Sequence, residues 1–314
     1  MSLIKAATER GWTHIQNTAV DSVEEALPRA SEKDFDVFVQ DVTMRVALVA
    51  ILDIDVSVRE LDSEDIRVVS KLITKLWSLS KQPGPIPAQL LPRLNYHLRR
   101  LIPDEKAYPN PLDFVIPVWE TMWRVVATSV AYAHSSAYAS NIFSKLHISP
   151  TMDQFRHSDG TQPSVEWFIT EVMRLHPPSQ RISRASPIHP FPAFLPLNLN
   201  KLAAKLFGPL LRRECADIGS VLKCKRIWGA DADTFEPLRF HCDRATREQE
   251  AIKSLPFGYG RLKCVAAGWA PMAAGILSAA ILDRVQAGSG FRLVEGKCIG
   301  GREGWSGWAI SNQL

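Results

Sequence analysis

The stretch that most constrains this chain covers residues 255–282, where a glycine-punctuated loop presents one cysteine and leads into a long apolar segment. Gly258 and Gly260 allow backbone turns that other residues adopt only under strain. Cys264 follows at the expected start of a helix, where unpaired N–H groups and the helix dipole favour a thiolate. The sequence therefore predicts a loop that holds one sulfur atom in place, backed by a buried helix over residues 265–282.

The composition is that of one folded unit. A chain of 314 residues that is 46% hydrophobic and 22% charged can bury one large core, so we expect a single domain over residues 1–314. A net charge of +4, without basic runs interleaved with aromatic residues, argues against a nucleic-acid partner.

The five cysteines are odd in number and show no Cys-x-x-Cys spacing, which favours neither a disulfide framework nor a zinc site. Residues 1–18 contain no apolar signal region, so we expect a cytoplasmic protein. Residues 265–282 carry no charge and just reach the length of a membrane span, but their alanines, glycines and proline favour a buried helix over a bilayer segment.

Hydrophobic periodicity predicts a mainly α protein that ends in a short β-rich tail, residues 288–314, with Trp305 and Trp308 facing the core. The predicted helices before the cysteine loop cover residues 11–26, 34–52, 63–80, 91–102, 110–134 and 165–176.

Residues 110–134 are apolar nearly all round, so this helix should cross the core, and Pro117 should bend it. Glu120 has two alternative roles. It is either a carboxylate in a pocket or one half of an ion pair with Arg124 four residues later.

A second charged pair occurs in the sequence EVMRLHPP, where Glu171 and Arg174 share one helix face. Two buried charges in this relation need a third partner, because an uncompensated buried charge costs several kcal/mol. Arg239, in the sequence FEPLRF, can supply it.

Together these motifs resemble the cytochrome P450 family, and the fungal-type members in particular. Phe257, Gly258, Gly260 and Cys264 match the haem-thiolate loop pattern Phe-Gly-x-Gly-x-Arg-x-Cys-x-Gly. The family's Glu-x-x-Arg and Pro-x-Arg-Phe motifs match the charged triad above, and its long helix matches residues 110–134. The matching motifs occur in the family's order over residues 110–282.

The resemblance implies a mainly α fold, with Glu171, Arg174 and Arg239 as a structural triad. If haem b is bound, it implies cofactor contacts from Phe257 and Gly260, with Cys264 as the iron ligand. It also places Glu120 and Thr121 at the family's acid–alcohol pair.

The sequence departs from the family at positions that bind haem. Leu262 and Ala266 stand where the family keeps an arginine and a glycine, and Trp12 is followed by Gln16 where the family's third helix has Trp-x-x-x-Arg. This alignment implies a chain that lacks the family's N-terminal helices and most of its small β-sheet. Burying haem propionates without cations is costly, so we expect no cofactor.

Between the triad motifs the sequence also departs from the family's short strands. Arg181 or Arg184 could bind an anion, and residues 187–196 are rich in proline. Residues 199–213 have a basic amphipathic helix pattern, which either covers an exposed core or contacts a membrane surface, such as the endoplasmic reticulum, peripherally.

These features favour a haem-free P450-derived enzyme of secondary metabolism that cyclises a hydrophobic terpenoid or polyketide without redox change, for example by an intramolecular Diels–Alder reaction. Trp119 and Trp123 would shape the substrate, unless both are core residues. Glu120, Thr121 or His189 would hydrogen-bond a substrate carbonyl. The alternatives are a haem-thiolate monooxygenase and a non-catalytic partner protein of a biosynthetic pathway.

Overall fold

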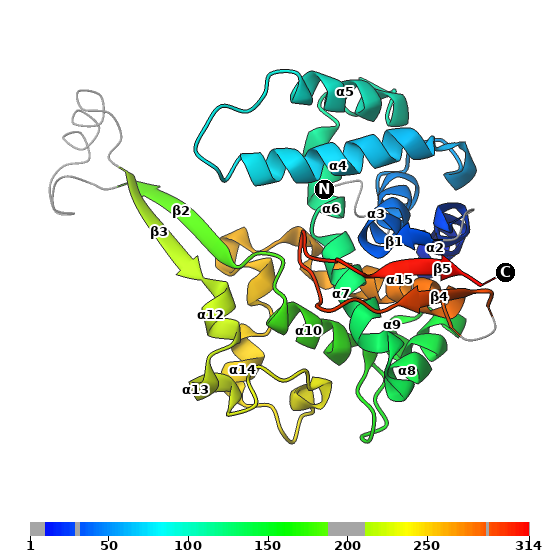
Figure 1. Cartoon of the computed structure of the whole chain (residues 1–314). Coiled ribbons are helices and arrows are strands. Elements are labelled where there is room, and N and C mark those ends of the chain that lie inside the picture. Colours follow the sequence, from blue (N-terminus) through cyan, green and yellow to red (C-terminus); the bar gives the residue numbers. More distant parts are fainter. Residues whose placement is uncertain (1–9, 29–31, 188–210, 287–288, 314) are drawn as a thin grey trace, which may run out of the picture.

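The computed structural model describes residues 10–28, 32–187, 211–286 and 289–313, which form a helical body with two small antiparallel sheets (Figure 1). The α-helices are α2 Trp12–Ala26, α3 Phe35–Val46, α4 Ser63–Leu79, α5 Leu90–Leu101, α6 Leu112–Trp119, α7 Met122–His134, α8 Ala137–Ile148, α9 Met152–Arg156, α10 Val165–Leu175, α12 Ile218–Leu222, α13 Lys225–Trp228, α14 Arg247–Ile252 and α15 Ala270–Arg284. The strands are β1 Glu32–Asp34, β2 Arg181–Pro187, β3 Leu211–Asp217, β4 Phe291–Val294 and β5 Ala309–Asn312. Short 3-10 turns are η2 Val58–Glu60, η3 Pro237–Phe240, η4 Leu255–Phe257, η5 Gly260–Leu262 and η6 Val265–Gly268, and η1 Ala47–Ile51 is a π-helical turn.

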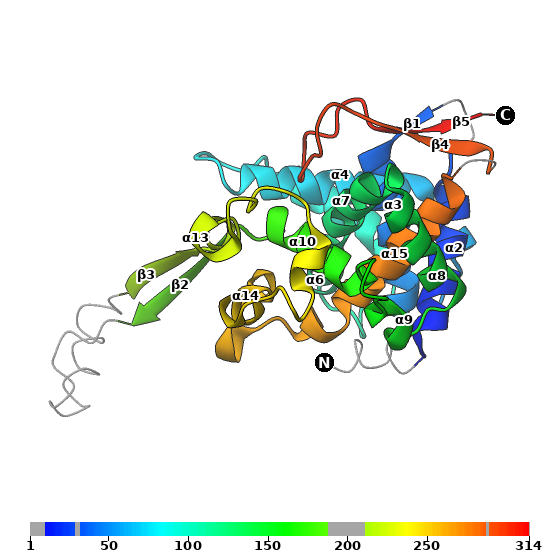
Figure 2. The same ribbon diagram turned by 90° about the horizontal axis from the view of Figure 1, so that it is seen from below.

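Helix α15 occupies the centre of the helical body. It packs against α2, α7, α8 and α10, and Figure 2 shows it lying among α2, α7 and α8. Every residue from Met272 to Leu282 is buried, as expected for a helix that is apolar all round. Within the described residues, no helix combines the length and apolar character that a membrane crossing requires.

The predicted helices before the cysteine loop are present, but several of their bounds differ, and α8, α9, α12, α13 and α14 were not predicted. The segment predicted as one helix over residues 34–52 is α3 continued by the π-helical turn η1. Helix α8 was missed, although Ser136 caps its N-terminus by accepting the N–H of Ala139 and its buried face has helical spacing (Ala139, Ile142, Phe143, Leu146). No proline or glycine separates α8 from α7, so the sequence offered no clear boundary.

The β-rich tail forms as predicted. Strands β4 and β5 join β1 in a sheet of order β1-β5-β4. Trp305 and Trp308 are buried, and their rings lie 5.4 and 5.8 Å from that of Phe35. The tail therefore closes the core beside the start of α3.

Strands β2 and β3 form an antiparallel ribbon that projects from the helical body in both views (Figures 1 and 2). Residues 181–187, for which no strand was predicted, therefore form β2. The helix predicted over residues 199–213 is wrong at its end, because residues 211–213 belong to β3 and pair with Ala185, Ser186 and Pro187. Residues 199–210 lie outside the described residues.

Candidate functional site

The cysteine loop faces an apolar cavity of about 370 Å³. Its walls come from the junction of α6 and α7, from the chain just after α10, and from the loop that leads into α15. The lining residues are Pro117, Val118, Thr121, Met122, Val125, Met173, Pro178, Ser179, Ile182, Pro256, Phe257, Gly258, Cys264, Ala266, Trp269, Ala270, Pro271 and Ala274.

The cysteine loop is closed by its own backbone. The N–H of Cys264 donates to the carbonyl of Phe257 at 2.7 Å, and Gly258 and Gly260 adopt φ values of 78° and 63°. Few other residues adopt such φ values without strain. The loop thereby holds an exposed, unpaired Cys264 thiol at the cavity wall.

The helix behind the loop begins later than predicted. Cys264 precedes the 3-10 turn η6, and α15 begins only at Ala270, after Trp269 breaks the run with φ −132° and ψ −31°. Val265 is 70% exposed, so the predicted buried helix over residues 265–282 is wrong at its start. The sulfur therefore does not stand at the N-terminus of the long helix.

The central helix is interrupted at Glu120 and Thr121, just beyond Pro117. Pro117 lies inside α6, which ends at Trp119, and α7 begins at Met122. Proline removes an N–H donor and its ring crowds the preceding turn. The break turns Pro117, Val118 and Thr121 toward the cavity.

The side chain of Glu120 is engaged in ion pairs. Its carboxylate accepts from Arg124 at 2.9 Å and from Arg302 Nε at 3.0 Å, and only 4% of the residue is exposed. The predicted pair with Arg124 is thus present, and Glu120 is not among the cavity-lining residues. Arg302 was missed because it lies 182 positions along the chain.

Arg124 joins two walls of the cavity. Besides Glu120, it donates to the carbonyl of Pro178 at 3.0 Å, and Pro178 lines the cavity. Burial lowers the pKa of the Arg124 guanidinium, and the neighbouring Glu120 carboxylate opposes that shift. The Glu120–Arg124 pair therefore fixes the helix break relative to the segment after α10.

Trp119 and Trp123 lie in the core and do not line the cavity. Both are fully buried, with ring centroids 6.3 Å apart, and the indole N–H of Trp119 donates to the carbonyl of Gln40 at 3.1 Å. Their position matches the alternative of core packing.

The triad is present beside the cavity. Glu171 pairs with Arg174 at 2.7 Å and with Arg239 at 3.0 Å, and both Glu171 and Arg174 are fully buried. The two guanidiniums also donate to backbone carbonyls of the segment between α12 and η3, at Leu222, Trp228, Asp231, Ala232 and Thr234. The triad thus fastens α10 to the segment that leads toward the cysteine loop.

Other predicted anion-binding positions lie elsewhere. Trp12 and Gln16 are on α2, outside the cavity wall, and the Gln16 amide donates to the carbonyl of His147. The alignment of Trp12 and Gln16 with propionate-binding residues is therefore wrong. Arg181 pairs with Asp217 at 3.6 Å and is mostly exposed. His189, predicted as a donor to a substrate carbonyl, lies outside the described residues.

The residues around the cavity offer a ligand for haem iron but no partner for the haem propionates among the described residues. Cys264 offers the thiolate that haem iron takes as an axial ligand. The propionates need cations, yet no Lys, Arg or His is among the cavity-lining residues in the described part of the chain. Arg261 and Lys263 flank the loop with exposed side chains, outside the cavity wall. Among the described residues, the cavity wall therefore presents one thiol and no cationic side chain.

Sequence reasoning missed part of the cavity wall. Met173, Pro178, Ile182 and Trp269 all line it. The only sequence signals were the two prolines that end α10 and the tryptophan just ahead of α15.

No family model and no curated protein matches the sequence. Among solved structures, a six-coordinated cytochrome P450 from Thermus thermophilus is similar, with a TM-score of 0.60 and 15% identity over 96% of this chain and 75% of that one. CYP175A1 from another strain of Thermus thermophilus gives a TM-score of 0.60 and 14% identity over 96% of this chain and 72% of that one. The mainly helical chain therefore has the cytochrome P450 fold.

Proposed function

We propose that this chain is a haem-free enzyme on the cytochrome P450 fold, which cyclises a hydrophobic terpenoid or polyketide intermediate of secondary metabolism without redox change. One observation carries the proposal: the cavity at the cysteine loop is walled by apolar residues and, within the described residues, has no cation to hold haem propionates. Its volume of about 370 Å³ lies within the range of about 300–1,000 Å³ for small-molecule sites.

Catalysis in such a cavity comes from substrate shape. Holding the two reacting ends of one molecule in contact can lower the barrier by several kcal/mol, since the entropy of its internal rotations is already lost on binding. Apolar side chains such as Val118, Met122 and Met173 exclude water from the folded substrate. A pericyclic ring closure needs no proton transfer and no nucleophile.

Of the residues predicted to hydrogen-bond a substrate carbonyl, Thr121 lines the cavity, and its hydroxyl would donate to that carbonyl. Glu120 has a different role in this proposal. Because two arginines hold its carboxylate, it positions Thr121 at the helix break rather than contacting the substrate. His189 stays a second proposed donor.

A haem-thiolate monooxygenase is the alternative, favoured by the presence of both Cys264 and Thr121 in the wall of one cavity. When bound, haem would supply oxygen activation at an iron ligated by Cys264. A non-catalytic partner protein is the third possibility, and its proposed contact at residues 199–213 lies mostly outside the described residues.

Haemin titration of the purified protein separates the first two functions. We expect no saturable Soret band, and no shift of such a band by carbon monoxide after reduction. The variant Leu262→Arg restores the family's arginine, so it should bind haemin more tightly than the wild type. Stoichiometric wild-type binding that is lost in Cys264→Ser would refute the haem-free proposal.

Turnover of candidate polyene intermediates without any reductant separates the enzyme from a binding protein. We expect Cys264→Ser to keep most of the cyclisation rate, whereas Thr121→Val should lower it about tenfold to a hundredfold, the loss of one hydrogen bond to a developing charge. Unchanged turnover in Thr121→Val would remove that residue from the mechanism.

A further inference from the structure

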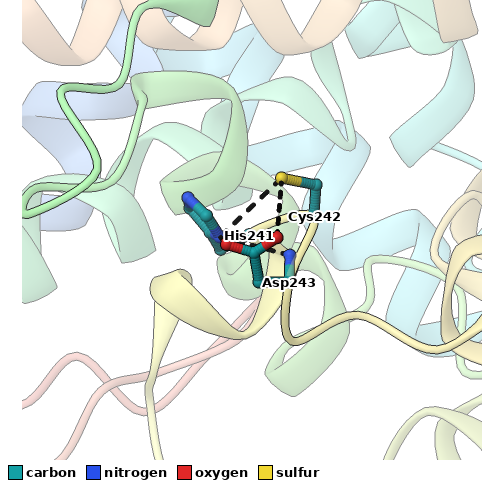
Figure 3. Close-up of side chains that lie close together, drawn as sticks. All are labelled: His241, Cys242 and Asp243. Carbon is teal, nitrogen blue, oxygen red and sulfur yellow. Dashed lines mark hydrogen bonds and ion pairs between the residues drawn. The ribbon is translucent and has the colours of Figure 1, made fainter.

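A turn outside the cavity brings three different metal-ligand donors together. His241, Cys242 and Asp243 directly follow η3 and offer an imidazole nitrogen, a thiol and a carboxylate. All three donor atoms lie within 4.8 Å of one another, and Figure 3 shows the side chains converging on one side of the turn. In the described residues, no other group of three such side chains lies this close.

The separations between donors are close to those of a tetrahedral site. With ligand bonds of about 2.0–2.3 Å, neighbouring tetrahedral ligands lie about 3.3–3.8 Å apart. The Cys242 Sγ lies 3.9 Å from His241 Nδ1 and 3.7 Å from Asp243 Oδ1, and Nδ1 lies 3.5 Å from Asp243 Oδ2. The two distances to Asp243 involve different oxygens, and one donor atom from each residue lies within 4.8 Å of the other two, so rotation of the exposed Cys242 and Asp243 side chains would place all three around one ion.

The backbone of this turn is anchored on both sides of the donors. Phe240 is buried, and the carbonyl of His241 accepts the N–H groups of Arg244 and Ala245, both at 2.9 Å. The His241 ring also meets Trp167 edge to face, with centroids 5.6 Å apart. The imidazole is therefore held in place before any ion arrives.

We propose that His241, Cys242 and Asp243 bind one divalent transition-metal ion of the zinc class. Nitrogen, sulfur and oxygen ligands together suit Zn²⁺, and the exposure of Cys242 and Asp243 leaves the fourth position to water. Binding replaces the hydrogen bond from the Asp243 N–H to Nδ1, which at 3.2 Å is long. The Cys242 thiol gives its proton to solvent and becomes the thiolate ligand.

Titration with Co²⁺, followed by absorption, tests the sulfur ligand directly, using reduced protein without an affinity tag. We expect a thiolate-to-cobalt charge-transfer band that saturates at one equivalent. Cys242→Ser should abolish the band, whereas Cys298→Ser, which removes another exposed thiol, should keep it. Excess Zn²⁺ should displace the cobalt, and the fluorescence of Trp167 should change with it.

Two further variants test the other ligands and the competing site. His241→Gln and Asp243→Asn should each weaken Zn²⁺ binding at least tenfold. A band that persists in Cys242→Ser would overturn the proposal, as would one that disappears only in Cys264→Ser, because the metal would then lie at the cavity thiol. Absence of any saturable band in the wild type would overturn it equally, and neither result would bear on haem binding.

Discussion

The buried triad gives a sharp test of what holds this fold together. In Glu171→Gln the carboxylate is lost while its neighbours stay. That carboxylate accepts four hydrogen bonds, two from Arg174 at 2.7 and 2.9 Å, one from Arg239 at 3.0 Å and one from the Glu236 N–H at 3.0 Å. A glutamine accepts through only one oxygen, and its amide N–H groups face guanidinium donors.

The expected cost follows from burial. Arg174, which is 0% exposed, would lose its counter-charge, and Arg239, which is 5% exposed, would keep only its pair with Asp231 at 3.3 Å. Breaking a buried ion pair on one side costs about 3–5 kcal/mol. For 314 residues the unfolding entropy is roughly 0.7 kcal/mol per degree, so the thermal midpoint should fall by about 5–8 °C.

The chain contains a matched control. Glu64 and Arg67 form the same Glu-Arg pair three residues apart on a helix, but their side chains are 59% and 54% exposed. Water solvates both charges there, so Glu64→Gln should leave the midpoint nearly unchanged. Thermal unfolding followed by circular dichroism compares the two variants, after reversibility has been checked. Equal shifts would show that burial is not what makes the triad important.

Two further predictions concern pH and backbone space. Burial, helped by the charge of Lys223, lowers the pKa of His176 from 6.5 to about 4, so its stabilising effect is complete above pH 6.5 and is lost as the pH falls toward 4. Before solvent screening this loss of stability is at most about 3 kcal/mol, and we expect about half of it. The free energy of unfolding, measured from pH 7 to 4.5, should depend less on pH in His176→Gln than in the wild type. Equal pH dependence in the two proteins would contradict this role of His176. Gly300→Ala places a Cβ 2.7 Å from the Trp305 ring and should cost about 1–3 kcal/mol in urea unfolding, whereas Gly301→Ala meets nothing within 4 Å and serves as its control.

The sequence predicted features whose partners are encoded in a local pattern. Glu171 and Arg174 share a helix face, and the resemblance of FEPLRF to the family's Pro-x-Arg-Phe motif indicated Arg239 as their third partner. Pro117 predicted a bend in the central helix, and the interruption between α6 and α7 lies just beyond it. Trp305 was expected in the core because a large ring in a β-rich tail seldom stays exposed.

Contacts between distant segments could not be predicted in this way. The sequence left Glu120 between a pocket and a pair with Arg124, and the second arginine, Arg302, is brought in by the tail. The same limit explains the wrong alignment of Gln16. A match of Trp12 and Gln16 to a family motif says nothing about the carbonyl of His147, to which the side chain of Gln16 donates. Such contacts depend on the packing of whole elements.

The error at Gln16 changes what the haem-free proposal depends on. Because Gln16 lies away from the cavity, it no longer supports the absence of haem. The haem-free proposal then rests on Leu262 in the sequence and on a cavity wall that has no cation among the described residues. Neither feature weakens the fold, because Glu171, Arg174 and Arg239 are absent from that wall although Met173 belongs to it. The ion pairs stabilise one face of α10 and its neighbours, while the cavity uses another face of the same helix. Residues that hold a cofactor can therefore change while the scaffold keeps its stability, which is why the fold alone does not determine the chemistry.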